Sequence, residues 1–419
     1  MSGFKELTSV AKAVEMLRAR VTHRPGKRKV RLEDSLGRYL AVDVVAPLNI
    51  PPSERAVVDG YAVRSADTFG SSPSNPSILR VKGFLRAGEE PKVSLSPGEA
   101  VEVATGAQLP PGADAVVMYE RTRRSGDILE VLEPVPPLGN VSRVGEDVRE
   151  GEVVLRKGTR LMPWDIAVLA SMGIGEVEVY DLRVGLLNVG SELVELGEAD
   201  AREALKRGLV INSNRYSISA LLTSYGFSPQ YLGIVRDELE EIREALGRAV
   251  REFDAVITVG GASVGRADLT VRAARELGAE VVIHGVQLRP GRANSAAVVQ
   301  GKPIFMLAGF PVAAIVGFEA LAKPLLLHMV GGEEEPKATV KGVLTRRVTT
   351  PINVRSYVRV RVFEEGGKTY VEPLALTGSG ILSTLVRGNG ILVVPEDREG
   401  YDEGEEVEVV LLRSPSRTP

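Results

Sequence analysis

Residues 183–330 alternate apolar runs with helix-like segments, and this alternation constrains the fold more than any other feature of the chain. Runs such as "RVGLLNVG" and "DAVITVGG" are continuously apolar, as strands buried on both faces are. Segments with helical patterns follow, among them "NRYSISALLTSYG", "DELEEIREALGRAVREF" and "DLTVRAARELG". We therefore predict a doubly wound α/β sheet with helices on both faces, closed by a hairpin-like "RPGRANSAAVV" and a last strand "PIFMLAG". Ligands of such sheets bind outside the carboxyl ends of the strands.

Two further regions are rich in strand signals. Residues 51–148 carry short β-rich runs between Gly, Pro and Ser turns, which predicts a small β-dominated domain. Residues 338–412 are strand-like throughout, with turns expected at Gly366-Gly367 and near Gly404. This second region predicts a small barrel or sandwich.

Two helices and a linker lie outside these regions. Residues 8–20 have helical spacing and begin at Thr8 or Ser9, both of which are good cap residues. A second helix is expected near 163–172, opened by a proline at its first turn. The segment "GGEEEPK" at 331–337 is typical of a linker.

The composition excludes several kinds of chemistry. The 419 residues include no Cys and three His, so disulfides, thiolate zinc sites and Cys nucleophiles are excluded. A bound metal should then be a hard cation held by carboxylates, with Mg²⁺ the first choice. A net charge of −3 argues against a nucleic-acid partner. The sequence shows no secretory apolar core and no run of about 18 apolar residues, so we expect no membrane and a cytoplasmic protein. The high share of Lys, Arg and Glu is typical of thermophiles.

The stretch "GGASVGRAD" follows one of the apolar runs. Gly260, Gly261, Ser263 and Gly265 would let backbone N–H groups approach an anion, and a helix starts just beyond them. The spacing matches neither the dinucleotide nor the P-loop fingerprint. A tight turn with Asp268 as a helix cap explains the stretch about equally well.

Acids follow three of the expected strands. Glu192, Asp237 and Asp268 each lie in a loop at the carboxyl edge of the sheet, and together they would suit an Mg²⁺–phosphate site. Helix capping is the stronger interpretation for Asp237 alone, because Glu240 follows three residues later as in a capping box. Asn214 could cap another helix.

The stretch "RPGRANS" supplies positive charge. Arg289 and Arg292 flank a Pro-Gly turn, so both guanidinium groups can reach one side of the loop and bind an oxyanion such as phosphate or molybdate. Two solvated surface arginines are the alternative.

An Asp-Gly turn lies far upstream. Asp59 and Gly60 follow a β-branched pair, and Thr105 and Gly106 end a strand-like run. Each of these is a common turn by itself. Thr105 and Gly106 would also suit an anion nest.

Several of these stretches, taken in order, resemble one known family. They are "VVDGYAVR", "ATGAQLPPGADAVV", "RVGEDVREGEVVL", "VGSEL", "GIVRD" and "GGASVGRAD". This series resembles the molybdopterin molybdenumtransferase family (MoeA and the E domain of gephyrin) over nearly the whole chain. The resemblance implies a transferase that inserts molybdate or tungstate into adenylylated molybdopterin and releases AMP, with a divalent cation, Mg²⁺.

The resemblance also implies the architecture. It predicts four domains: a discontinuous linking domain at 1–50 and 149–180, a β-rich inserted lid domain at 51–148, an α/β molybdopterin-binding domain at 181–332 resembling molybdopterin adenylyltransferase, and a C-terminal β-barrel at 336–412. It further implies a homodimer whose site is shared between subunits, and an adenylyltransferase as the partner that precedes it in the pathway.

Carried onto this sequence, the family's functional positions fall on named residues. Asp59, Asp147, Glu192, Asp237 and Asp268 match its catalytic acids, of which Glu192, Asp237 and Asp268 would be the metal ligands. The expected substrate-binding residues are Gly60, Thr105, Gly260, Gly261, Ser263, Gly265, Arg289, Arg292, Pro311, Ser379 and Ser383.

The chain departs from the family pattern at two places. Arg289 and Arg292 stand where the family has two Lys around a Pro-Gly. The stretch "GFPVAA" keeps Pro311 but lacks the Asn and the second Pro of Gly-Leu-Pro-Gly-Asn-Pro. Two alternative functions therefore stay open, the adenylyltransferase step and a non-catalytic pterin-binding or scaffolding protein.

Overall fold

The computed structural model describes residues 7–198, 200–261, 268–375 and 378–415 of the chain. These residues form two compact units. The α/β–barrel unit comprises Met1–Val42, Lys157–Met162 and Glu176–Pro419, and the inserted unit comprises Asp43–Arg156 and Pro163–Gly175. The division into four domains remains a prediction.

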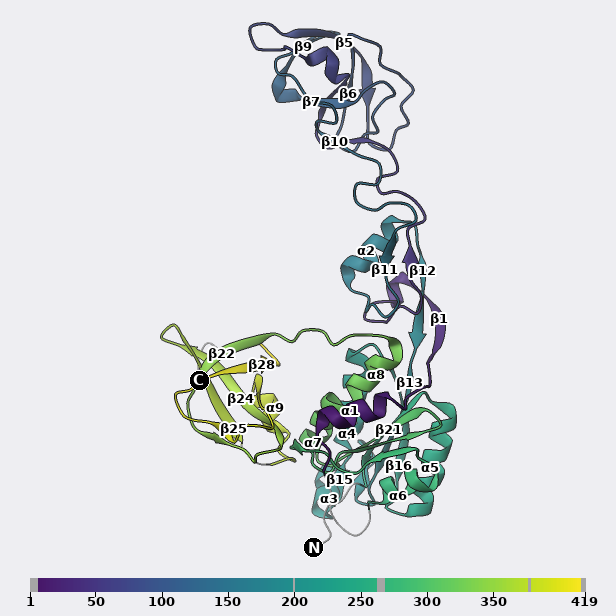
Figure 1. Ribbon diagram of the computed structural model, residues 1–419, viewed down its shortest axis with the longest axis vertical. Helices are drawn as coiled ribbons and strands as arrows, with labels where there is room; N and C mark the ends of the chain where they lie inside the picture. Colours follow the sequence, from purple (N-terminus) through teal and green to yellow (C-terminus); the bar gives the residue numbers. More distant parts are fainter. Residues whose placement is uncertain (1–6, 199, 262–267, 376–377, 416–419) are drawn as a thin grey trace. The chain divides into compact units, whose positions relative to one another are not determined.

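The α/β–barrel unit contains a six-stranded sheet in the order β16-β13-β17-β21-β20-β18 (Figure 1). Four neighbouring strands are parallel, and two antiparallel strands complete one edge. The strands are β13 (Arg183–Val189), β16 (Ser228–Val235), β17 (Ala255–Gly260), β18 (Val281–Ile283), β20 (Ser295–Val299) and β21 (Lys302–Leu307). Two short strands, β14 (Leu193–Val194) and β15 (Val210–Ile211), pair apart from it.

Helices cover both faces of this sheet, as the alternating sequence predicts. Successive strand residues enter different cores: Leu186 packs with one set of helices, and the next residue, Leu187, packs with the other. The first set comprises α1 (Val10–Arg18), α4 (Ser213–Ser224) and a long helix at 311–330, and the second comprises α5 (Leu239–Glu252) and α6 (Leu269–Glu276). A short α3 (Ala201–Lys206) precedes β15. Ser9 caps α1 and confirms one of the two predicted caps.

The long helix is apolar because it is a core element. It consists of α7 (Pro311–Gly317), a π-helical turn (Phe318–Ala322) and α8 (Lys323–Val330). Its 20 residues are long and apolar enough to cross a membrane, but 78% of its apolar window is buried inside the protein. Its composition therefore reflects packing against the sheet.

The stretch "RPGRANSAAVV" does not form the predicted hairpin. Its first strand, β19 (Leu288–Arg289), pairs in parallel with β24 (Arg355–Glu365) of another sheet, and β20 pairs with β21 instead. Backbone hydrogen-bonding groups accept any strand of suitable geometry, so a partner more than 60 residues away cannot be read from local spacing. This pairing attaches the segment between β18 and β20 to the C-terminal strands.

The C-terminal strands close into a five-stranded barrel. The barrel strands β24, β25 (Lys368–Ala375), β22 (Thr339–Leu344), β28 (Glu406–Leu411) and β26 (Gly390–Val394) pair in sequence, and β26 pairs back to β24. Gly366 and Gly367 form the predicted turn, with positive φ angles, and Gly404 lies in a second turn of this kind. The short elements β23 (Val348–Thr349), β27 (Gly400–Tyr401) and α9 (Ser383–Arg387) complete this region.

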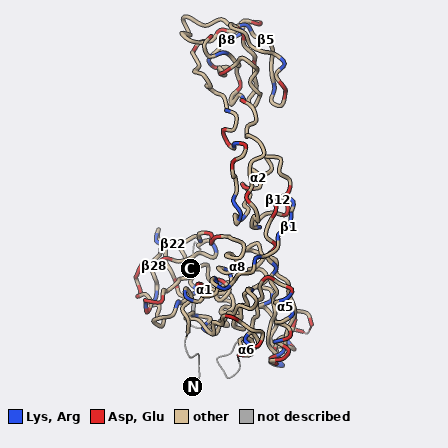
Figure 2. Tube along the Cα trace, turned by 45° about the vertical axis from the view of Figure 1, so that its right-hand side comes forward, with Lys and Arg blue, Asp and Glu red and all other residues tan. Residues whose placement is uncertain are grey.

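Charged groups fix two connecting segments of this unit. Residues 331–337 form neither helix nor strand, as expected of a linker, but Glu334 pairs with buried Lys323 at 3.4 Å and Lys337 pairs with Glu319 at 2.7 Å. A two-stranded antiparallel ribbon pairs the first segment of this unit with its third, and one strand is basic while the other is acidic (Figure 2). It consists of β1 (Gly26–Arg31) and β12 (Glu176–Asp181), with ion pairs Lys27–Glu178 and Arg28–Asp181.

The inserted unit is built on a second six-stranded sheet, in the order β7-β4-β6-β5-β9-β8, and confirms the predicted β-rich region. Its strands are β4 (Gly60–Val63), β5 (Ser77–Leu85), β6 (Glu99–Val103), β7 (Ala115–Met118), β8 (Thr122–Ser125) and β9 (Ile128–Val131). Short pairs lie outside it: β2 (Val44–Val45) with β11 (Val153–Leu155), and β3 (Arg55–Ala56) with β10 (Val141–Ser142). Pro163 opens α2 (Pro163–Ser171), as predicted.

Candidate functional site

Asp237 ties together two loops at the carboxyl edge of the α/β sheet. Its Oδ2 accepts the Ser191 backbone N–H at 2.9 Å, and its own backbone N–H donates to Ser191 Oγ at 3.2 Å. The capping-box interpretation is wrong, because Glu238 holds the N-cap position of α5 without a side-chain hydrogen bond. Asp237 hydrogen-bonds to the neighbouring loop instead of capping its own helix. Its carboxylate stays exposed at the carboxyl edge of the sheet.

Asp268 caps α6 and is nearly buried, with 5% of its side chain exposed. Its Oδ1 accepts the Val271 N–H at 3.2 Å and the Thr270 hydroxyl at 2.9 Å, which confirms the predicted cap. Its Oδ2 lies 3.1 Å from Nε2 of His284, which comes from the segment after β18. Burial raises the pKa of Asp268, although the hydrogen bonds and His284 oppose this shift. Sequence reasoning missed His284, because one isolated His carries no spacing signal.

Gly260 shows why glycines, and not residues with side chains, stand at the end of β17. Its φ is +97°, and a Cβ there would lie 2.0 Å from the Val189 carbonyl oxygen of the adjacent strand. Gly261 also has a positive φ and is packed against Val189 and Thr270. Glycine is therefore required for strand packing, whatever it binds. The anion cradle stays a prediction, since Ser263 and Gly265 lie outside the described residues.

The three acids do not form one ligand cluster. The Glu192 carboxylate is exposed and folds back over Gly190, where its Oε2 would lie 2.7 Å from an added Cβ. Within the described part of the chain, no group of three or more His, Asp or Glu side chains could hold a metal ion. Hard carboxylate oxygens at this edge suit Mg²⁺ only if substrate phosphates supply further ligands. The shared magnesium site stays a prediction.

Buried polar atoms gather near the same edge. Asn188 Oδ1, Thr258 Oγ1 and Asn214 Oδ1 have no hydrogen-bond partner among the described residues. The predicted cap at Asn214 is wrong, because Asn212 is the N-cap of α4 and Asn214 donates to the Gly309 carbonyl at 2.7 Å. Buried polar atoms normally have partners, so these atoms are candidates for a ligand or for water. The predicted sites include neither Asn188 nor Thr258.

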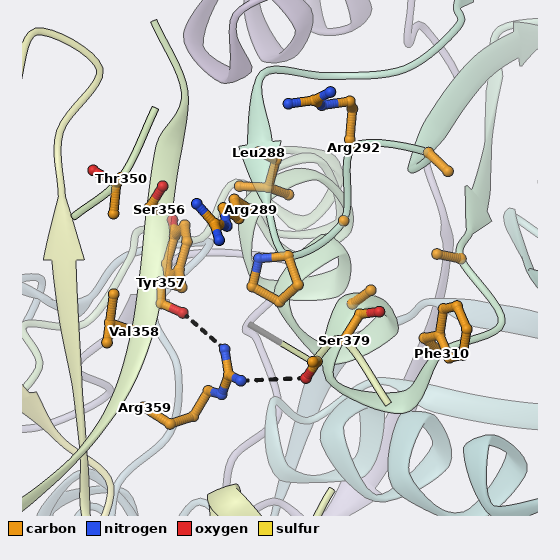
Figure 3. A pocket seen from close by; sticks show the side chains of 16 residues that line it. Leu288, Arg289, Arg292, Phe310, Thr350, Ser356, Tyr357, Val358, Arg359 and Ser379 are labelled. Carbon is orange, nitrogen blue, oxygen red and sulfur yellow. Dashed lines mark hydrogen bonds between the residues drawn. The ribbon is translucent and has the colours of Figure 1, made fainter. Parts of the chain in front are cut away.

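A cationic pocket of about 330 Å³ lies between the α/β sheet and the barrel (Figure 3). Arg289 and Arg292 reach it from the "RPGR" loop, and Arg359 reaches it from β24. None of its described lining residues is Asp or Glu. The pocket is lined by Leu288, Arg289, Pro290, Gly291, Arg292, Ala293, Ala308, Phe310, Ala313, Thr350, Ser356, Tyr357, Val358, Arg359, Gly378 and Ser379. Three guanidinium groups without a lining acid give this pocket a positive charge that would suit an oxyanion.

Arg359 is a candidate binding residue of this pocket that the sequence analysis does not single out. It is 3% exposed and donates to Thr384 Oγ1 at 3.2 Å, to the Tyr357 carbonyl at 3.4 Å and to the Gly378 carbonyl at 3.2 Å. Burial, and then the nearby Arg289 charge, lower the pKa of Arg359. In the sequence it is one of several Arg in a strand-like run, so nothing local distinguishes it.

The structure separates the two serines that the sequence proposed. Ser379 lines the cationic pocket, and its carbonyl accepts the Val312 N–H at the start of α7 at 3.1 Å. Pro311 is the first residue of that helix. Ser383 begins α9 and is not among the described residues that line the pocket.

The upstream motif forms its own local arrangement in the inserted unit. Asp59 accepts the Thr105 backbone N–H at 2.7 Å and the Thr105 hydroxyl at 2.9 Å. These bonds lower the pKa of the exposed Asp59. Gly60 is required because a Cβ there would lie 2.0 Å from the Val117 carbonyl oxygen. Asp147 is exposed in an open hollow of about 630 Å³ that Val57 also lines.

Comparison with known proteins gives one consistent family. Three family descriptions match: the MoeA N-terminal region (domain I and II) over residues 8–173, a probable molybdopterin binding domain over 185–328, and the MoeA C-terminal region (domain IV) over 341–412.

Individual relatives agree with these matches. A molybdopterin molybdenumtransferase of Bacillus subtilis is 36% identical over 92% of this chain and 89% of its own length. A relative from Methanocaldococcus jannaschii, whose name places it in molybdopterin biosynthesis, is 40% identical over 92% of each chain. The crystal structure of the molybdopterin biosynthesis MoeA protein from Pyrococcus horikoshii OT3 is 34% identical, with a TM-score of 0.82 over 97% of this chain and 100% of that one.

Proposed function

We propose, from the premise that this chain belongs to the MoeA family, that it inserts molybdate into adenylylated molybdopterin and releases AMP. The observation that carries the proposal is the cationic pocket, which Arg289, Arg292 and Arg359 line and to which the described residues contribute no acid. A tetrahedral dianion is the ligand that such a pocket suits best. Tungstate has the same charge and nearly the same size, so it is an equal candidate.

The arginines would act by charge neutralisation and positioning. Arg359 is fixed by three hydrogen bonds and cannot swing away, so its charge is already oriented when the oxyanion arrives. Such preorganised charges in a partly enclosed site stabilise developing negative charge strongly. The sequence contains no Cys, and the proposed route needs no covalent protein intermediate.

The acids would serve the phosphoanhydride that is cleaved. Because Asp268, Asp237 and Glu192 do not form one ligand cluster, they would supply only part of the coordination of Mg²⁺, and substrate phosphate oxygens would supply the rest. A cation bound there would supply charge neutralisation at the phosphoanhydride. Asp237 is held ready for this role by the Ser191 N–H. We further propose a cytoplasmic homodimer in which Asp59 and Thr105 complete the site of the second subunit, on the family resemblance alone.

The test is AMP release from adenylylated molybdopterin in Mg²⁺, with molybdate, with tungstate or with neither. We expect release to depend on the oxyanion and to fall about 10- to 100-fold in Arg359→Met, the usual loss for one charged hydrogen-bonding group. Arg361→Met is the matched control, because Arg361 lies on the same strand but pairs with Glu372 at 2.9 Å.

Three outcomes would contradict the proposal. AMP release without any oxyanion would indicate a hydrolase. Binding of the nucleotide without release would indicate a binding protein. Synthesis of the adenylylated pterin from ATP would indicate the adenylyltransferase step.

A further inference from the structure

Phe310 is an exposed aromatic residue at the cationic pocket. It is 62% exposed, whereas its helix neighbours Val312 and Ala314 are fully buried. Figure 3 shows its ring on the side of the pocket away from Thr350 and Val358 of the barrel region. Ligand pockets usually combine apolar or aromatic side chains with a few placed polar groups, and Phe310 beside the arginines fits this pattern.

The backbone that carries Phe310 is fixed on several sides. The Gly309 carbonyl accepts the Asn214 amide at 2.7 Å, and the Ala308 N–H donates to buried Asn294 Oδ1 at 2.7 Å. Phe310 is itself the N-cap residue of α7, whose Val312 N–H donates to the Ser379 carbonyl. The ring is therefore presented from a rigid support, which lowers the entropy lost when a ligand packs on it.

The segment around Phe310 contacts both the barrel and the carboxyl edge of the α/β sheet. On one side the barrel loop approaches closely, since a Cβ added at Gly380 would lie 3.1 Å from a ring carbon. The loop that carries Phe310 also contacts the α/β sheet, since a Cβ added at Gly309 would lie 3.5 Å from the Cα of Gly260. Phe310 therefore lines the same pocket as the arginines and directly follows a residue that lies against the end of β17.

We propose that Phe310 is a stacking platform for the pterin ring of the substrate, an inference that rests on the proposed transferase function. The oxyanion joins the molybdopterin half of the substrate, whereas AMP leaves. The planar ring nearest the arginines is therefore the pterin rather than the adenine. Stacking of a planar heterocycle on an aromatic side chain contributes to binding without requiring a particular hydrogen-bond pattern. Phe310 is then a specificity-determining residue that binds substrate without taking part in bond cleavage.

The test measures equilibrium binding of three probes, neopterin, AMP and tungstate, to the full chain. Phe310→Leu keeps an apolar side chain but removes the aromatic face, and Phe310→Tyr restores it. We expect Phe310→Leu to weaken neopterin binding about tenfold or more, with tungstate affinity unchanged and Phe310→Tyr close to wild type. In turnover, KM should rise while kcat stays within about twofold. Phe69→Leu is the matched control, since Phe69 is 60% exposed in the inserted unit.

The outcomes separate this inference from the proposed function. Unchanged neopterin affinity in Phe310→Leu, or no neopterin binding by wild type, would overturn the stacking role even if AMP release is normal. Weakened AMP binding with unchanged neopterin binding would overturn the pterin assignment. Phe310-dependent neopterin binding without any AMP release would support the platform while the transferase function fails.

Discussion

Asp59 in the inserted unit and Asp268 in the α/β–barrel unit accept the same kinds of hydrogen bond, one from a backbone N–H and one from a threonine hydroxyl. Their pKa values nevertheless move in opposite directions, down for Asp59 and up for Asp268. Asp59 is exposed, so the hydrogen bonds from Thr105 outweigh its desolvation penalty. Asp268 is nearly buried, so desolvation of the charged form outweighs its donors and His284.

Hydrogen bonds alone therefore do not determine the direction in which the pKa of a carboxyl group shifts; burial also decides it. Asp59 is held as an anion by Thr105 and can present its charge to a ligand at any physiological pH. The charged form of Asp268 is disfavoured by burial, and a cation that reaches it would offset this penalty. The two acids are therefore suited to different tasks, presentation of charge by Asp59 and response to a bound cation by Asp268.

The largest expected effect concerns activity. Asp268→Asn keeps an oxygen that can cap α6 but removes the charge, and we expect oxyanion-dependent AMP release to fall about 100-fold or more. Asp268→Ala should lose as much activity and also about 1 kcal/mol of stability, because the cap is lost. Activity assays and urea unfolding of both variants measure this. Full activity of Asp268→Asn would show that the residue only caps the helix.

A smaller effect is expected at the threonine donors. Thr270 is fully buried, so Thr270→Val should lower the free energy of unfolding by about 1 kcal/mol and raise the pKa of Asp268 further. Thr105 is exposed, so water can replace its hydroxyl and Thr105→Val should change stability less. Calorimetric unfolding of the two variants compares them directly. Equal losses would show that burial does not distinguish the two sites.

The smallest expected effect is the pH dependence of each carboxyl. Because the pKa of Asp59 is lowered on folding, its contribution to stability is present above the ordinary Asp pKa near 3.9 and is lost as pH falls through its folded pKa. Because the pKa of Asp268 is raised, its contribution is greatest at low pH and decreases as pH rises through its folded pKa.

Carboxyl ¹³C NMR of Asp-labelled protein tests these directions, with Asp59→Asn and Asp268→Asn to assign the two signals. We expect the Asp59 signal to titrate below the ordinary Asp range and the Asp268 signal above it. If the pKa values of both carboxyl groups shift in the same direction from the ordinary Asp value, the contrast between Asp59 and Asp268 is wrong.

Much of the fold follows from local patterns. The continuously apolar strands, the helix cap at Asp268 and the turn at Gly366-Gly367 were predictable because strand burial, capping and turns depend on neighbours in the chain. The capping box at Asp237 and the cap at Asn214 were predicted by the same logic and are wrong. There, Ser191 and the Gly309 carbonyl, both distant in sequence, offered partners that replaced the local ones.

The sequence by itself determined the alternating α/β core, the strand-rich regions, the exclusion of cysteine chemistry and the family, because each depends on residue types in order along the chain. Only the tertiary structure decided that β19 pairs with the barrel, that Arg359 joins Arg289 and Arg292, and that His284 meets Asp268. These meetings join residues 16 to about 70 positions apart. They are set by sheet pairing and packing, which bring such residues together without leaving any periodic signal in the sequence.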